Sequence, residues 1–277
     1  IGAYLVGHKM IWIQSRVALR PEHVRELEQL TLSLVGLHVS ERTDNLIVLQ
    51  SLADPSKPTM DNSIRRLHLI SSFMREKAVK ALVAGNANDL PDVLTMGKEA
   101  DRVYWLVVRQ LLSAVDDPKL AEALGIRSRC WLLGDRAVLT NLKAVVNRTE
   151  KIAKETSKLL QLGFCLESEA LDDISQLDAA IVDVSEGAIG ALMTLDIARG
   201  NQVIENIKSM EEAANRIMDR LSETVKATDC RSSIFRLVHA FNEIAVRYET
   251  IAEIAINRAL EQSGDYASID MGFLDKR

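Results

Sequence analysis

The chain has 277 residues, of which 47% are apolar and 26% charged, as expected of a globular protein that buries its own core. Lys and Arg number 34 against 39 Asp and Glu, so the net charge of −5 provides no positive field to attract nucleic acid or anionic lipid. Five prolines and only 4% aromatic residues argue against a β-sandwich and predict long helices.

The cysteines and the hydropathy pattern point to the cytoplasm. Three cysteines lie far apart without any CxxC spacing, which is typical of reduced thiols in a cytosolic protein: Cys130, Cys165 and Cys230. No stretch approaches about 18 uninterrupted apolar residues, so we expect no membrane span.

The first fifty residues predict a small α/β unit. Residues 9–14 alternate between apolar and polar types, as a strand does, and Pro21 stands where prolines open helices. Gly36 ends that helix, and two short strands follow at 37–39 and 46–49. We place this unit at residues 1–53, with a proline-containing linker after it.

From Thr59 onward the spacing of apolar residues is helical almost without pause. Breaks are expected at 85–91, at Asp116, Asp117 and Pro118 with Gly125, at 162–163 and at 199–201, and Thr228 and Asp229 offer caps for the last helix. Six helices are predicted, at residues 60–84, 89–115, 130–162, 166–198, 201–227 and 230–262.

Two of these helices carry especially clear apolar stripes. The third runs from Leu139 through Leu142, Val145, Val146, Thr149, Ile152 and Ala153 to Leu159. The last runs from Ile234 through Leu237, Val238, Phe241, Ile244, Ala245, Tyr248, Ile251 and Ala252 to Ala255. Neither stripe keeps a strict seven-residue repeat, so we expect packing within a bundle rather than a free coiled coil.

The six helices fall into two similar halves, which predicts two tandem three-helix bundles over residues 59–163 and 166–263. Three short matches keep the same order in both halves: 76–82 with 186–192, 99–103 with 213–217, and 151–154 with 250–253.

Motifs for enzymatic chemistry are absent from the sequence. No GxGxxG, GxxxxGK[ST], GxSxG or HExxH string occurs. The five histidines are scattered, and we expect them to be surface or core residues: His8, His23, His38, His68 and His239. We therefore predict no catalytic residue and no cofactor-binding residue.

Charged residues on the helices are expected to lie on solvated faces. Glu249 and Glu253 share one helix face, and inward carboxylates of this kind can hold metals in helical bundles, but charged side chains are mostly exposed. The same expectation covers Asp172, Asp173, Glu211 and Glu212, and the basic residues Arg65, Arg66, Arg75, Lys77 and Lys80. A metalloenzyme of the helical-bundle carboxylate type remains a minor alternative.

Two segments resemble PhoU-type phosphate uptake regulators. Residues 98–111 (KEADRVYWLVVRQL) resemble the signature of the second helix in that family, and residues 251–258 (IAEIAINR) resemble the end of its third helix. The duplicated three-helix arrangement over residues 59–263 also resembles that family. The stretches at 4–7 (YLVG) and 47–50 (IVLQ), before Asp54 and Pro55, are similar to archaeal members, which often carry an AbrB-like DNA-binding segment further upstream.

The resemblance implies a cytosolic, non-enzymatic regulator of phosphate uptake, expected to be a homodimer. It implies contacts with a component of a phosphate transporter or with a sensor kinase. The alternative is a transcriptional regulator whose DNA-binding segment lies upstream of Ile1.

Members of the family commonly bind iron or zinc clusters through an acidic residue and an Asp four positions later on each third helix. The matching positions here are Lys143 and Asn147 in the first half, and Asn242 and Val246 in the second. Because a lysine ammonium repels a cation, we predict no metal-binding residue and no cofactor. Glu249 and Glu253 would take the place of these ligands only if the register of the last helix were shifted.

Overall fold

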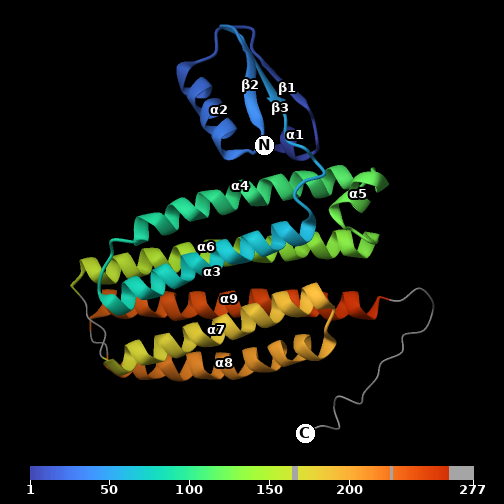
Figure 1. Ribbon diagram of the computed structural model, residues 1–277. Coiled ribbons are helices and arrows are strands. Elements are labelled where there is room, and N and C mark those ends of the chain that lie inside the picture. Colours follow the sequence, from blue (N-terminus) through green and yellow to red (C-terminus); the bar gives the residue numbers. More distant parts are fainter. Residues whose placement is uncertain (164–167, 225–226, 262–277) are drawn as a thin grey trace. The chain divides into compact units, whose positions relative to one another are not determined.

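The computed structural model describes residues 1–163, 168–224 and 227–261 (Figure 1). Within these ranges the order of elements is α1 (Gly2–Leu5), β1 (Met10–Gln14), α2 (Pro21–Ser33), β2 (Leu37–Arg42), β3 (Leu46–Ser51), α3 (Met60–Ala84), α4 (Leu90–Ala114), α5 (Pro118–Leu124), α6 (Arg129–Gln161), α7 (Ser168–Thr194), α8 (Ile197–Thr224) and α9 (Thr228–Leu260). The predicted class, mainly α with a small α/β unit at the N-terminus, is confirmed.

The chain forms two compact units. The first comprises Ile1–Leu67 and Lys98–Leu139, and the second comprises His68–Gly97 and Thr140–Arg277. Helices α3, α4 and α6 each run through both units. Among the described residues, no helix combines the length and the apolar character needed to cross a membrane.

In the first unit, the N-terminal segment is an antiparallel sheet of order β1-β3-β2. Trp12 pairs with Val48, and a bulge between Val39 and Glu41 interrupts the pairing of β2 with β3. The core of this segment consists of Tyr4, Val24, Leu34, Leu37, Ile47 and Leu49.

Two consecutive residues of α4 hold the N-terminal segment in the first unit. The buried Arg109 guanidinium donates to the backbone carbonyls of Tyr4, Gly7 (3.0 Å) and His8 (3.2 Å), and it lies 4.6 Å from the centre of the Tyr4 ring. The Gln110 amide donates to the carbonyls of Pro55 and Pro58. Part of the family-like segment 98–111 therefore has a structural role.

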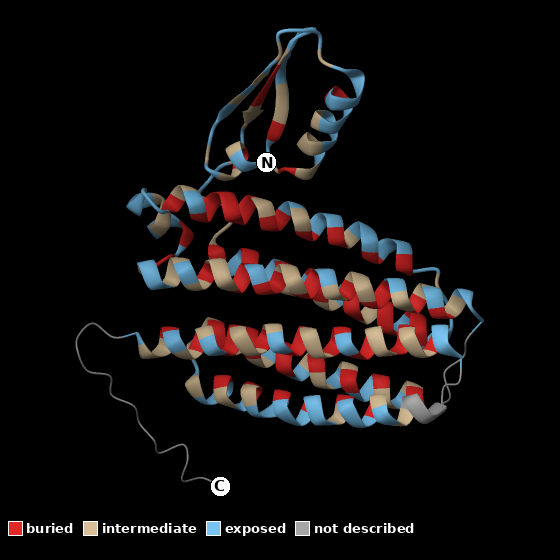
Figure 2. Ribbon diagram, turned by 180° about the vertical axis from the view of Figure 1, so that it is seen from behind, coloured by how far each residue is buried: buried red, intermediate tan, exposed pale blue. Residues whose placement is uncertain are grey.

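In the second unit, α7, α8 and α9 pack against one another. Each helix has a buried face and an exposed face, as the burial colours in Figure 2 show. Every residue of the stripe predicted from Ile234 to Ala255 is at most 2% exposed, so the predicted core face of α9 is confirmed.

The predicted break at 199–201 is wrong. The chain turns earlier, at Leu195, which adopts a left-handed backbone (φ 57°), and Asp196 accepts a hydrogen bond from the backbone N–H of Arg199 at 3.0 Å. Gly200 lies inside α8 and is buried, and a Cβ atom there would stand 2.8 Å from Cγ1 of Ile256 on α9. This glycine allows close helix packing instead of ending a helix.

Candidate docking groove

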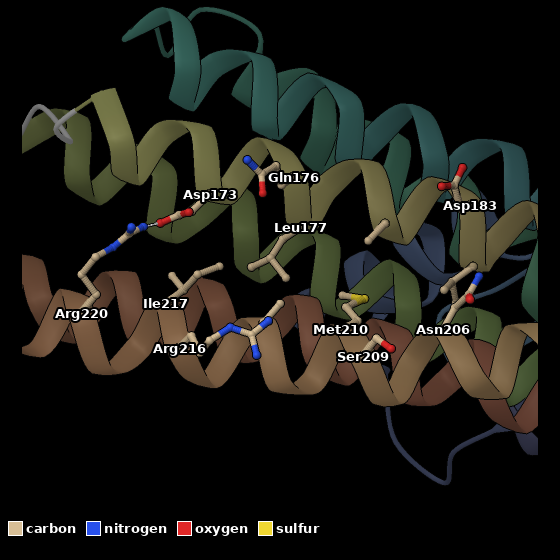
Figure 3. Close-up of a pocket in the computed structure, with 13 residues that line it drawn as sticks. Asp173, Gln176, Leu177, Asp183, Asn206, Ser209, Met210, Arg216, Ile217 and Arg220 are labelled. Atoms are coloured by element: carbon tan, nitrogen blue, oxygen red, sulfur yellow. Dashed lines mark ion pairs between the residues drawn. The ribbon is translucent and has the colours of Figure 1, made fainter.

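A groove of about 640 Å³ lies between α7 and α8 in the second unit (Figure 3). Its floor is apolar and is formed by Leu177, Ala180, Val184, Met210, Ala213 and Ile217. The four larger side chains are buried in the helix packing, whereas the two alanines are half-buried. The hollow therefore arises where the two helices present small side chains to each other.

An ion pair closes one end of the groove. Asp173 of α7 pairs with Arg220 of α8 across the groove, and Arg220 also bonds Glu169 at 2.7 Å. The Asp173 carboxylate is 18% exposed and the Arg220 side chain 35%, so this end is partly shielded from water. Figure 3 shows Asp183 and Asn206 at the other end.

The two walls of the groove differ in charge. Residues 168–194, which form α7, include six carboxylates and no Lys or Arg. Asp183 stands exposed on this wall. On the α8 wall, Arg216 is 71% exposed and lies 3.9 Å from the exposed Glu212, a separation at which the attraction is weak. The α7 wall is therefore the acidic one.

The described lining contains no histidine or cysteine and no pair of groups placed for acid–base or nucleophilic chemistry. An open groove with an apolar floor and polar walls is the geometry into which an amphipathic helix fits. The arrangement is suited to binding such a helix.

A second polar feature is buried in the same unit. It comprises His68, Ser71 and Arg75 of α3, Asp178 and Ser185 of α7, and Tyr248 of α9. Arg75 forms an ion pair with Asp178, and Nδ1 of His68 lies 3.1 Å from the Tyr248 hydroxyl. The prediction that Arg75 belongs to a solvated face is wrong, since Arg75 is only 7% exposed.

Burial controls the proton affinities in this cluster. Desolvation, together with the positive charge of Arg75, lowers the pKa of His68 to about 4. Desolvation also raises the pKa of Tyr248 to about 12, against the opposing effect of hydrogen bonds with Ser71 and Ser185. At neutral pH the cluster therefore holds one ion pair, a neutral imidazole and a neutral phenol.

The positions that match the family's metal ligands carry no carboxylate. Lys143 donates a hydrogen bond to Oδ1 of Asn147 at 2.6 Å, so these two side chains bond each other. On α9, Val246 is apolar and 37% exposed. Within residues 1–163, 168–224 and 227–261, no three His, Cys, Asp or Glu side chains are grouped to hold a metal ion.

Glu249 and Glu253 lie beside Glu211 of α8. Glu253 is exposed, as expected, whereas Glu249 is half-buried. Burial, followed by the charges of Glu253 and Glu211, raises the pKa of Glu249. Of the cysteines, Cys130 is exposed and Cys230 buried, and Cys165 lies outside the described residues.

No known protein-family profile matches the sequence, and no curated protein matches it. Solved structures do. PhoU from Pseudomonas aeruginosa superposes with a TM-score of 0.62 at 13% identity, covering 71% of this chain and 93% of that one. The phosphate transport system regulatory protein PhoU from Streptococcus pneumoniae gives 0.58 at 10% identity, covering 71% and 91%.

The chain has a PhoU-like fold. At 10–13% identity, the likeness lies in the arrangement of helices and not in shared side chains. The PhoU-like fold thus agrees with the resemblance that residues 98–111 and 251–258 carry in the sequence.

Proposed function

We propose that this protein is a non-enzymatic regulator of phosphate uptake and phosphate homeostasis that acts through contacts with other proteins. The observation that carries the proposal is the structural likeness to two PhoU proteins, which covers 93% and 91% of their chains. The apolar groove between α7 and α8 supports a mode of action by protein contact.

In this proposal the protein is a cytoplasmic homodimer. Its partner is a phosphate transporter component or a sensor kinase. The proposed organisation is an α/β unit at 1–53 followed by repeats at 59–163 and 166–263. The two solved structures give no support to the alternative of a DNA-binding transcriptional regulator.

Phosphate uptake in the host organism tests the proposal. Uptake of radiolabelled phosphate is compared in wild-type cells, in cells lacking the gene, and in cells complemented with the full chain. We expect the deletion to alter uptake in phosphate-rich medium and complementation to restore it. Equal uptake in all three strains, at both high and low phosphate, would overturn the proposal.

A further inference from the structure

We propose that the contact between α6 and α9 in the second unit binds inorganic phosphate through Arg148 and Arg247, with Glu243 accepting a hydrogen bond from the bound ion. The inference rests on the proposed function and deepens it, because it names the signal that the regulator senses. The side chains that carry it are nevertheless independent of the likeness to PhoU.

Two ion pairs fix how α6 and α9 lie against each other. Arg148 of α6 bonds Glu243 of α9 at 2.6 Å, and Glu155 of α6 accepts two hydrogen bonds from Arg236 of α9, at 2.6 and 3.0 Å. The second pair lies seven residues later on α6 and seven residues earlier on α9. The two helices are therefore antiparallel and keep the same register through both pairs.

This register places Arg247 close to Arg148. Arg247 follows Glu243 by one helical turn, on the same side of α9, so it lies opposite Ala144. Ala144 in turn precedes Arg148 by one turn on α6, and its small side chain leaves room between the helices. Both guanidinium groups therefore lie beside the carboxylate of Glu243.

Both guanidinium groups have unused hydrogen-bonding capacity. Nε of Arg148 and Nε of Arg247 are buried without a partner, and Arg247 forms no hydrogen bond or ion pair with the residues that the structure describes. Arg247 is half-buried and the Arg148 side chain is 32% exposed, so a small ion can reach them from solvent. Because guanidinium groups bind phosphate oxygens through paired hydrogen bonds, an oxyanion is the ligand that they fit.

The charges around these two residues leave a positive excess. Glu243 is shared between Arg148 and the exposed His239, whose Nε2 lies 3.6 Å from it. The half-buried Lys151, about one turn after Arg148 on α6, adds a further positive charge. Arg247 is therefore a partly desolvated cation whose compensation is incomplete, and a bound anion would stabilise it.

Neighbouring carboxylates on the same two helices serve other contacts. Glu155 is held by Arg236, and Glu150 lies 3.7 Å from Lys154. Glu249 lies beside Glu211 of α8, on a different side of α9. None of these three carboxylates therefore provides the counter-ion of Arg247.

Glu243 determines which oxyanion fits best. Inorganic phosphate keeps at least one O–H group at neutral pH, whereas sulfate has none. A carboxylate accepts a hydrogen bond from that O–H group but repels an anion that has no proton to donate. We therefore expect the site to prefer phosphate to sulfate.

Equilibrium dialysis of the full chain against radiolabelled inorganic phosphate tests the proposal, with unlabelled sulfate as competitor at neutral pH. Arg247→Gln removes the guanidinium group without a partner. Its control is Arg216→Gln, which removes the same charge from α8, where the side chain is 71% exposed. Glu243→Gln removes the carboxylate that distinguishes the two ions. Circular dichroism of each variant checks that it folds.

We expect saturable phosphate binding to the wild type, with sulfate competing at least about tenfold less well than unlabelled phosphate. Arg247→Gln should weaken phosphate binding at least about tenfold, whereas Arg216→Gln should leave it unchanged. Glu243→Gln should let sulfate compete as well as phosphate does. This last result is a gain of binding, which a misfolded variant could not show.

Several outcomes overturn the proposal. They are the absence of saturable phosphate binding, equal competition by sulfate in the wild type, and an equal loss of affinity in Arg247→Gln and Arg216→Gln, which would indicate general charge attraction. Binding to phosphatidic acid vesicles that inorganic phosphate does not displace, but that Arg247→Gln abolishes, would assign the site to a lipid headgroup instead.

The phosphate site and the proposed function can fail separately. If deletion of the gene alters phosphate uptake and Arg247→Gln complements the deletion fully, the phosphate site fails as the sensor while the proposed function stands. If the purified chain binds phosphate through Arg247 but deletion leaves uptake unchanged at high and low phosphate, the proposed function fails while the binding site stands.

Discussion

His68 is the residue at which pH acts most directly on this fold. Its ring is largely buried next to Tyr248, and its neighbour Arg75 is positively charged, so protonation of the ring is disfavoured. The folded-state pKa of about 4 lies below the ordinary value of 6.5. The unfolded chain therefore binds a proton more readily than the folded chain between these two values.

We expect the free energy of unfolding to fall as the pH drops from 6.5 to 4, by up to about 3 kcal/mol from this group, and to be insensitive to His68 above pH 7. Urea denaturation at pH 7.5, 5.5 and 4.5 measures the effect. His68→Gln should flatten the dependence, whereas His239→Gln, at an exposed position, should not. An unchanged slope in His68→Gln would show that other groups cause the acid sensitivity.

At the scale of single elements, α8 depends on close approach to its neighbours. A Cβ atom at Gly200 would stand 2.8 Å from a methylene carbon of Ile256, and one at Gly187 of α7 would stand 2.6 Å from a methyl group of Val203 on α8. Both glycines thus lie where a helix contacts another helix, and both carry ordinary helical backbone.

We expect Gly200→Val to lower the free energy of unfolding by about 1–3 kcal/mol, because the added side chain pushes α8 away from α9. Ala198→Val introduces the same β-branched side chain at an exposed position of the same helix and should change stability by less than about 0.5 kcal/mol. Thermal melts of the two variants compare them directly. If the two variants differ in stability by less than the experimental error, α9 shifts to accommodate the valine without lowering the free energy of unfolding.

The elements that could be predicted from the sequence are those whose signal is local. Periodicity predicts the core face of α9 because every third or fourth residue from Ile234 onward is apolar. Between helices, Asp117 caps α5, Pro118 opens it and the left-handed Gly125 ends it, although in the sequence these residues indicate only a break and not a short helix. Gly200 was misassigned because a glycine that permits packing and one that ends a helix look alike in a single sequence.

The polar cluster and the groove could not be predicted in the same way. His68, Asp178 and Tyr248 lie on three helices far apart in the sequence, and each alone resembles an ordinary surface or core residue. The groove depends on Ala180 and Ala213 lining the same hollow, and alanine is common on both faces of helices. Such features arise from pairing between helices, which periodicity along one helix does not encode.

At the scale of the whole molecule, the two halves of the sequence share one compact unit. The second unit joins the C-terminal part of α3 to α7, α8 and α9, and the Arg75–Asp178 pair connects α3 to α7 within it. Both side chains are mostly shielded from water, at 9% and 19% exposure. Removal of one partner leaves a buried charge without compensation.

We expect Arg75→Met to destabilise the protein by about 3–5 kcal/mol, since Asp178 then remains buried without its cation. The double variant Arg75→Met/Asp178→Leu should recover a large part of this loss because the isolated charge is gone. Guanidinium denaturation of the wild type, of Arg75→Met, of Asp178→Leu and of the double variant completes the cycle. If the two single substitutions simply add in the double variant, the pair makes no coupled contribution.

The composition of α7 also bears on the order in which the chain assembles. Its six carboxylates have no cation within the helix, so the isolated segment repels itself at neutral pH. The cations that pair with three of these carboxylates lie elsewhere in the chain: Arg75 precedes α7 by about a hundred residues and pairs with Asp178, and Arg220 follows α7 and pairs with Glu169 and Asp173. We therefore expect Asp178 to find its cation as soon as α7 is made, whereas Asp173 and Glu169 find theirs only after α8 has been synthesised.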